Sequence, residues 1–140
     1  MRVRTLRGQL NDTLVHRIIV DDGRTNHGYI IKQFHVWPDG TGEDGVYAVL
    51  GTQYDMVSGG NASDNRQIAW AAGCFSSTAT ESASTFSIVD PDHVVNQDLY
   101  IQAMVGIEAT NYLVVLEPIV MTEDQAIMAL IKERSQDDIR

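Results

Sequence analysis

Short runs of alternating apolar and polar residues, separated by turn-rich segments, occupy this chain up to about residue 121. In residues 14–20, Leu14, Ile18 and Val20 share one parity, with His16 among them. A period of two is the pattern of a β-strand with one buried face. Similar runs follow at residues 29–37, 46–54, 66–75, 85–89, 98–105 and 111–121, and residues 2–8 make an eighth. The sequence therefore predicts about eight antiparallel strands.

The alternation also predicts which side chains are buried. One face of residues 29–37 is expected to hold the even-numbered residues Ile30, Lys32, Phe34 and Val36. In residues 66–75 one side is expected to hold Ile68, Trp70 and Ala72, with Trp70 buried. In residues 98–105 the expected inward residues are Leu99, Ile101, Ala103 and Val105. Residues 111–121 are apolar on both parities, which predicts two covered faces, and Pro118 indicates an edge or a bend.

About eight antiparallel strands separated by turns fit an all-β sandwich, and a jelly roll is its natural eight-stranded version. An immunoglobulin-like sandwich is the alternative, although the Cys…Trp…Cys pattern of that fold is missing. With 140 residues the chain has the length of one domain. We therefore expect a jelly-roll-like sandwich over residues 1–121, followed by a helix and tail over residues 122–140.

The last segment has the features of an amphipathic helix. Thr122 is a suitable N-cap, and Gln125 follows three positions later, as a capping box requires. Acidic residues begin the segment and basic residues lie near its end: Glu123, Asp124, Lys132 and Arg134. The apolar stripe consists of Ile127, Leu130 and Ile131, widened by Met128. A helix this short is marginal alone, so the stripe is expected to pack on its own sheet or on a neighbouring copy.

The net charge of −9 is distributed unevenly along the chain. Residues 1–32 contain six Arg and Lys against three Asp, whereas residues 33–131 contain Arg66 alone against thirteen Asp and Glu. Such an acidic body repels phosphates, so direct nucleic-acid binding is not expected. The basic segment with Arg2, Arg4 and Arg7 is expected either to be solvated or to contact an acidic neighbour.

No motif for catalysis or nucleotide binding is found, including G-x-S-x-G, the P-loop and G-x-G-x-x-G. The histidines lack the close spacing of metal ligands: His16, His27, His35 and His93. The single Cys74 excludes an internal disulfide. Residues 90–93, DPDH, fit a turn better than a calcium site. We expect no enzyme activity, no cofactor and no bound metal. No apolar run is long enough for a membrane span.

Four stretches carry a resemblance to a known group of proteins: DDGRTNHGYIIKQFHVW, DNRQIAW, VDPDHVVNQDLYI and NYLVVLEPIVMTEDQAIMALIKERSQD. They resemble small uncharacterised proteins encoded in structural gene clusters of marine bacteriophages, over about residues 17–138. The resemblance implies a virion protein made in the host cytoplasm, such as a minor capsid, vertex or decoration subunit. It implies no catalytic residue.

These features predict a structural protein that forms homo-oligomers, trimers or pentamers, and contacts other capsid proteins. The candidate interface residues are Arg2, Arg4, Arg7, Ile127, Leu130 and Ile131. A carbohydrate- or receptor-binding module is the alternative. It would use the polar loops 39–45, 55–65 and 76–84, or stacking aromatic residues, which are Tyr29, Trp37, Tyr47 and Trp70. A cupin-like metal enzyme is a third possibility, against which the histidine spacing counts.

Overall fold

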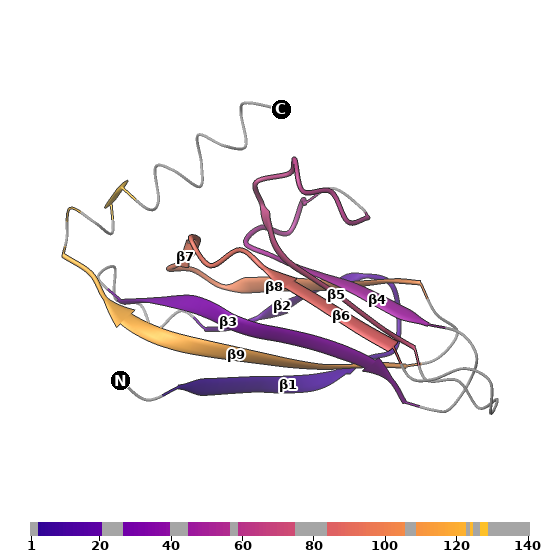
Figure 1. Ribbon diagram of the computed structural model, residues 1–140. Coiled ribbons are helices and arrows are strands. Elements are labelled where there is room, and N and C mark those ends of the chain that lie inside the picture. Colours follow the sequence, from indigo (N-terminus) through magenta and orange to yellow (C-terminus); the bar gives the residue numbers. More distant parts are fainter. Residues whose placement is uncertain are drawn as a thin grey trace.

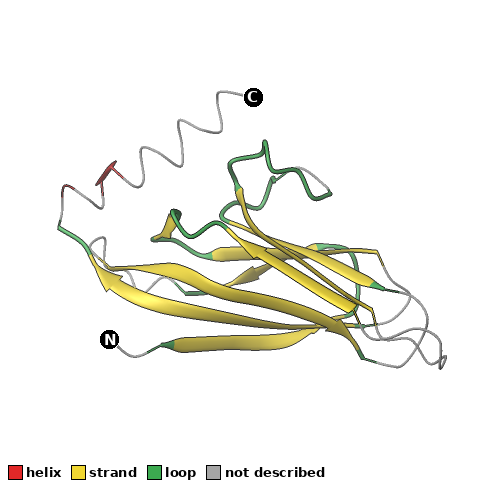
Figure 2. Ribbon diagram, in the orientation of Figure 1, coloured by secondary structure: helices red, strands yellow, loops and turns green. Residues whose placement is uncertain are grey.

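The computed structural model describes residues 3–20, 27–39, 45–56, 59–74, 84–105, 109–122, 124 and 127–128. Strands account for most of this part of the chain (Figure 2). They are β1 (Arg4–Leu10), β2 (Val15–Ile18), β3 (His27–Pro38), β4 (Val46–Gly51), β5 (Gln67–Cys74), β6 (Ser84–Val89), β7 (Val94–Val95), β8 (Leu99–Val105) and β9 (Thr110–Val120). All eight predicted strands are present, and only β7, with two residues, was not predicted.

The strands form two antiparallel sheets that face each other, which confirms the predicted all-β sandwich (Figure 1). Sheet A has the order β1-β9-β3-β7, and sheet B has the order β2-β8-β4-β5-β6. The pairing is nested: β1 pairs with β9, β2 with β8, β3 with β7, and β4 with β5. Successive pairs thus alternate between the two sheets. β6 lies outside this nesting and pairs with β5 at the edge of sheet B.

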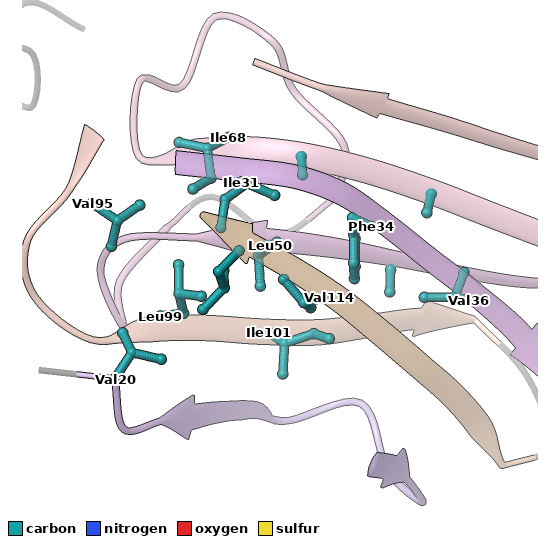
Figure 3. Close-up of a cluster of buried hydrophobic side chains, with 14 of the residues drawn as sticks. Val20, Ile31, Phe34, Val36, Leu50, Ile68, Val95, Leu99, Ile101 and Val114 are labelled. Carbon is teal, nitrogen blue, oxygen red and sulfur yellow. The ribbon is translucent and has the colours of Figure 1, made fainter. Parts of the chain in front are cut away.

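The hydrophobic core lies between the two sheets (Figure 3). Its largest fully buried side chains include Phe34, Ile31, Leu50, Leu99, Ile101 and Leu116. The inward positions predicted for Leu99, Ile101 and Ala103 are confirmed, whereas the side chain of Val105 lies outside the description. Removing this apolar surface from water is the main favourable contribution to folding.

The alternation predicted for residues 29–37 is wrong before residue 33. The register of β3 against β9 shifts between Ile31 and Gln33, so that Lys32 is an extra residue in β3. A bulge of this kind inverts the parity of the residues before it. As a result Ile31, at 1% exposure, joins Phe34 in the core, while Ile30 is only partly buried. Lys32 is exposed and pairs with Glu117 at 3.1 Å.

Trp70 also lies on the face opposite to the one predicted. Ala69 and Ala71 fill the core side of β5, and Trp70 is partly buried on the outer face of sheet B. Ile68 is buried in the core because a register shift between β4 and β5 makes it an extra residue. Trp70 was predicted to be a core residue because the run contains no visible sign of this shift.

Two further predictions are only partly right. Val20 is buried, but Leu14 is exposed, because its N–H bonds to the Asp12 carboxylate at 3.0 Å in a bend before β2. In β9 the core face is buried, whereas the opposite face is partly exposed. Pro118 pairs with Tyr29 of β3 and lies beyond Leu116, the last residue of β9 with a described partner in β1, so its edge position stays a prediction.

Little of the predicted C-terminal helix is described. Asp124, Ile127 and Met128 are helical, while Leu130 and Ile131 lie outside the described residues. Ile127 and Met128 are 48% and 65% exposed, so these two side chains are not buried against either sheet of their own chain. In the described residues we find no helix with the length and apolarity needed to cross a membrane.

β3 and β5 approach each other closely at one end of the sandwich. A Cβ atom on Gly73 would lie 2.5 Å from the Val36 carbonyl oxygen and 3.3 Å from the Trp37 Cα atom. The Ser87 hydroxyl of β6 donates a hydrogen bond to the Phe34 carbonyl oxygen at 2.5 Å. The two sheets are therefore joined here by backbone contact as well as by apolar side chains.

Gly73→Ala is expected to lower the free energy of unfolding by about 1–3 kcal/mol, because the added methyl group meets rigid backbone. Urea unfolding followed by circular dichroism measures the change. Gly45→Ala is the matched control, since its Cβ would lie 3.4 Å from the nearest atom, the Gly73 carbonyl oxygen. Equal losses in the two variants would contradict the close approach.

Candidate interaction surfaces

The first candidate surface is the open edge of β1 in sheet A. Arg4 and Arg7 are exposed there, and the Arg4 Nη1 atom donates to the Tyr29 hydroxyl at 2.9 Å. The Arg4 guanidinium also lies over the Tyr29 ring, 5.5 Å from its centroid. Among the described residues, neither arginine has a carboxylate partner. The other described cations each pair with one: Arg17 with Asp98, Lys32 with Glu117, and Arg66 with Asp64 and Asp55.

Among the described residues, two basic side chains of this acidic chain therefore lie at a sheet edge without an ion pair. Arg2, the third basic residue predicted for this interface, lies outside the described residues. Ile127 belongs to the segment after β9, on a different element from Arg4 and Arg7. The candidate residues thus fall into two groups on separate elements.

The second candidate surface is the open edge of β6 in sheet B. The Asp90 N–H donates to the Ile68 carbonyl oxygen of β5 at 2.8 Å. In an antiparallel ladder, every second residue directs its N–H and C=O groups to the same neighbour. Asp90, Ile88 and Phe86 therefore face β5. The backbone groups of the intervening residues point to the open edge: Thr85, Ser87 and Val89.

The third candidate surface is the outer face of sheet B, where aromatic side chains gather: Tyr47, Tyr54, Trp70, Phe86 and Tyr100. The rings of Tyr47 and Phe86 lie 6.3 Å apart, and Tyr54 meets Tyr100 edge to face at 6.4 Å. Partial burial raises the pKa of the Tyr47 hydroxyl. Phe86 and Ile88 remain 43% and 55% exposed. Part of this apolar face is therefore open to a partner.

The segment between β4 and β5 covers another part of this face and rises from it in Figure 1. A Cβ atom on Gly60 would collide with the Tyr47 hydroxyl, and one on Gly51 would collide with the Met56 sulfur. Val49 is fully buried although it is not part of the core between the sheets. This segment therefore closes a small second apolar layer over sheet B.

Buried polar groups hold the segment in place. Arg66 and Asp64 are both buried, and the Arg66 Nε atom donates to the Asp64 Oδ1 atom at 2.9 Å. Arg66 also pairs with the exposed Asp55 at 3.2 Å. The Thr52 N–H donates to the Arg66 carbonyl oxygen at 2.8 Å. Because removing one partner of such a pair leaves a buried charge, the pair constrains the segment strongly.

Gln67 adds a second connection. Its Oε1 atom accepts hydrogen bonds from the Asn61 N–H and the Trp70 Nε1 atom, both at 2.8 Å. Its Nε2 atom donates to the Gly59 carbonyl oxygen at 2.7 Å. Sequence reasoning treated residues 55–65 as a polar loop and missed this network. The sequence feature that could have indicated this network is Arg66, the single Arg or Lys within residues 33–131.

The remaining sequence predictions concern metal and turn chemistry. Asp90 Oδ1 accepts a hydrogen bond from the Asp92 N–H at 3.0 Å, which confirms the turn at residues 90–93. The described histidines are dispersed, with His16 bonded to Asp12 and His35 to Gln33. Within the described residues, no three His, Cys, Asp or Glu side chains form a group suited to a metal ion. The absence of metal and of enzyme activity stays a prediction.

Arg66→Met is expected to lower the free energy of unfolding by about 3–5 kcal/mol, because it leaves the buried Asp64 carboxylate without its cation. Chemical denaturation measures the loss. Lys32→Met is the matched control, because its pair with Glu117 is largely exposed and should contribute only about 0–1 kcal/mol. Similar losses for both variants would show that the Arg66 pair is not the constraint described.

Comparisons with known proteins do not assign a function to these surfaces. No protein-family model, no curated protein and no solved structure matches this chain. Its function is therefore inferred from its own strand order, open edges, charges and aromatic side chains.

Proposed function

We propose that this chain is a structural virion protein, such as a minor capsid, vertex or decoration subunit. It acts through homo-oligomeric assembly and through contacts with other capsid proteins. The observation that carries the proposal is the nested pairing of β1 with β9, β2 with β8, β3 with β7, and β4 with β5. Without β6, the sheets would have four strands each, as expected for an eight-stranded jelly roll. Viral capsid domains are one of the classes that use this fold.

A fold does not assign a function by itself, so the proposal needs support from surface chemistry. That support comes from Arg4 and Arg7, which have no carboxylate partner in the described part of an acidic chain. In a cyclic oligomer one surface of each subunit meets a different surface of the next. A basic edge and an acidic body are complementary in such an arrangement. We also propose that the oligomer is a trimer or a pentamer and that the sandwich is a jelly roll.

Size-exclusion chromatography with light scattering tests this assembly. The protein is expected to form a trimer or pentamer at low salt and to dissociate partly at high salt, because exposed ion pairs are screened. Replacing Arg2, Arg4 and Arg7 together by Gln should shift the oligomer toward monomer, since each exposed pair contributes about 0–1 kcal/mol. Lys32→Gln, which also removes an exposed cation, is the control. A strict monomer at every concentration would contradict the proposal.

The outer face of sheet B favours a second candidate function, carbohydrate binding. Lectin domains also use the jelly roll. Tyr54, Phe86 and Ile88 are exposed on this face, and the network around Arg66 and Gln67 fixes the segment that carries Tyr54. A rigid aromatic surface with polar groups beside it is suited to stacking on a sugar ring.

A glycan array tests the second candidate. If the protein binds glycans through this face, Tyr54→Ala should weaken binding about tenfold, a loss of about 1.4 kcal/mol. Tyr54→Phe keeps the ring and should retain most of the affinity. A protein that binds no glycan on the array, or whose Tyr54→Ala variant binds unchanged, would exclude this function.

A further inference from the structure

β1 and β6 are the two long edge strands of the sandwich. They contain seven and six residues, whereas the other two edge strands, β2 and β7, contain four and two. Exposed sheet edges are usually protected by charged residues, proline or bulges. The sequence of β6, STFSIV, contains no charged residue and no proline. Residues 85–88 are all exposed, so the edge of β6 is accessible for pairing.

Opposite charges lie at the start of β1 and at the end of β6, the two ends that would meet in an antiparallel pair. Arg4 begins β1, and Asp90, exposed, directly follows β6. Antiparallel alignment brings the first residue of one strand beside the end of the other, so it would place Arg4 next to Asp90 of another copy. A β1–β1 pair would instead bring arginines together, and a β6–β6 pair would give Arg4 and Arg7 no carboxylate partner among the described residues.

We propose that the open edge of β6 binds β1 of a second copy of this chain, in antiparallel orientation. The inference rests on the proposed homo-oligomeric function and names the surfaces that carry it. Sheet B of one copy then continues into sheet A of the next. Backbone groups of Thr85, Ser87 and Val89 supply the main-chain hydrogen bonds, and the contact of Arg4 with Asp90 selects the direction. Because the two surfaces differ, repetition of the contact closes a ring when the rotation permits.

The first test blocks the edge of β6 in the full-length chain. Thr85→Pro removes an N–H that points to the open edge and leaves the hydrogen bonds of Phe86 and Ile88 with β5 in place. Light scattering should show loss of the oligomer, with the far-ultraviolet circular dichroism unchanged. Thr85→Val, which keeps the N–H, is the matched control and should remain oligomeric.

The second test exchanges the charges and does not depend on whether the proline variant folds. Arg4→Glu and Asp90→Arg should each raise the dissociation constant by up to about fivefold, as expected for loss of an exposed ion pair. The two changes combined in one chain should restore most of the affinity. Arg4 also contacts Tyr29 of its own chain, but loss of that contact alone would not be reversed by a change at Asp90.

The outcomes separate the two proposals. A strict monomer would overturn the homo-oligomeric function, and this inference with it. An oligomer that is unaffected by folded Thr85→Pro and by both charge variants would overturn only the inference. Loss of the oligomer in both single charge variants without restoration in the combined variant would overturn the pairing of Arg4 with Asp90. Restoration in the combined variant supports the proposal.

Discussion

The packing of β3 against sheet B is the contact on which the sandwich depends. β3 pairs with β9 over most of its length in sheet A, and its Phe34 side chain is fully buried between the layers. At Gly73 of β5 the absence of a side chain lets the backbone of β3 approach closely. The bulge at Lys32 is what turns both Ile31 and Phe34 into the core. A residue change at either point alters the fit of the two layers.

The same topology determines which surfaces remain for partners. Nested pairing leaves β1 and β2 at one end of the two strand orders, and β6 and β7 at the other. Among the described cations, Arg17, Lys32 and Arg66 form ion pairs, so Arg4 and Arg7 of β1 are the described cations that remain for an acidic neighbour. The outer face of sheet B has a covered part and an open part, because the segment after β4 covers Val49 but leaves Phe86 exposed. Assembly and ligand binding therefore have separate candidate surfaces on one small sandwich.

Much of this architecture could be predicted from periodicity, because each long strand has its own alternating run. The orientation of side chains was less predictable, since a single extra residue reverses the parity of a strand and leaves no mark in composition. Lys32 in β3 and Ile68 in β5 are extra residues of this kind. β7, with two residues, is too short to show a period. The basic candidates Arg4 and Arg7 were found from charge alone, whereas the open edge of β6 depends on strand order, which local sequence does not encode.

Nested pairing also has a consequence for the order in which the chain can fold during synthesis. Gln9 of β1 and Asn111 of β9 are bonded to each other across a sequence separation of 102 residues. β1 therefore leaves the ribosome long before its partner strand exists, and such distant pairing slows folding. In this interval the arginines of β1 act as gatekeepers, because charged residues on an unpaired strand hinder association with other nascent strands. The basic edge is thus useful before the native protein has formed.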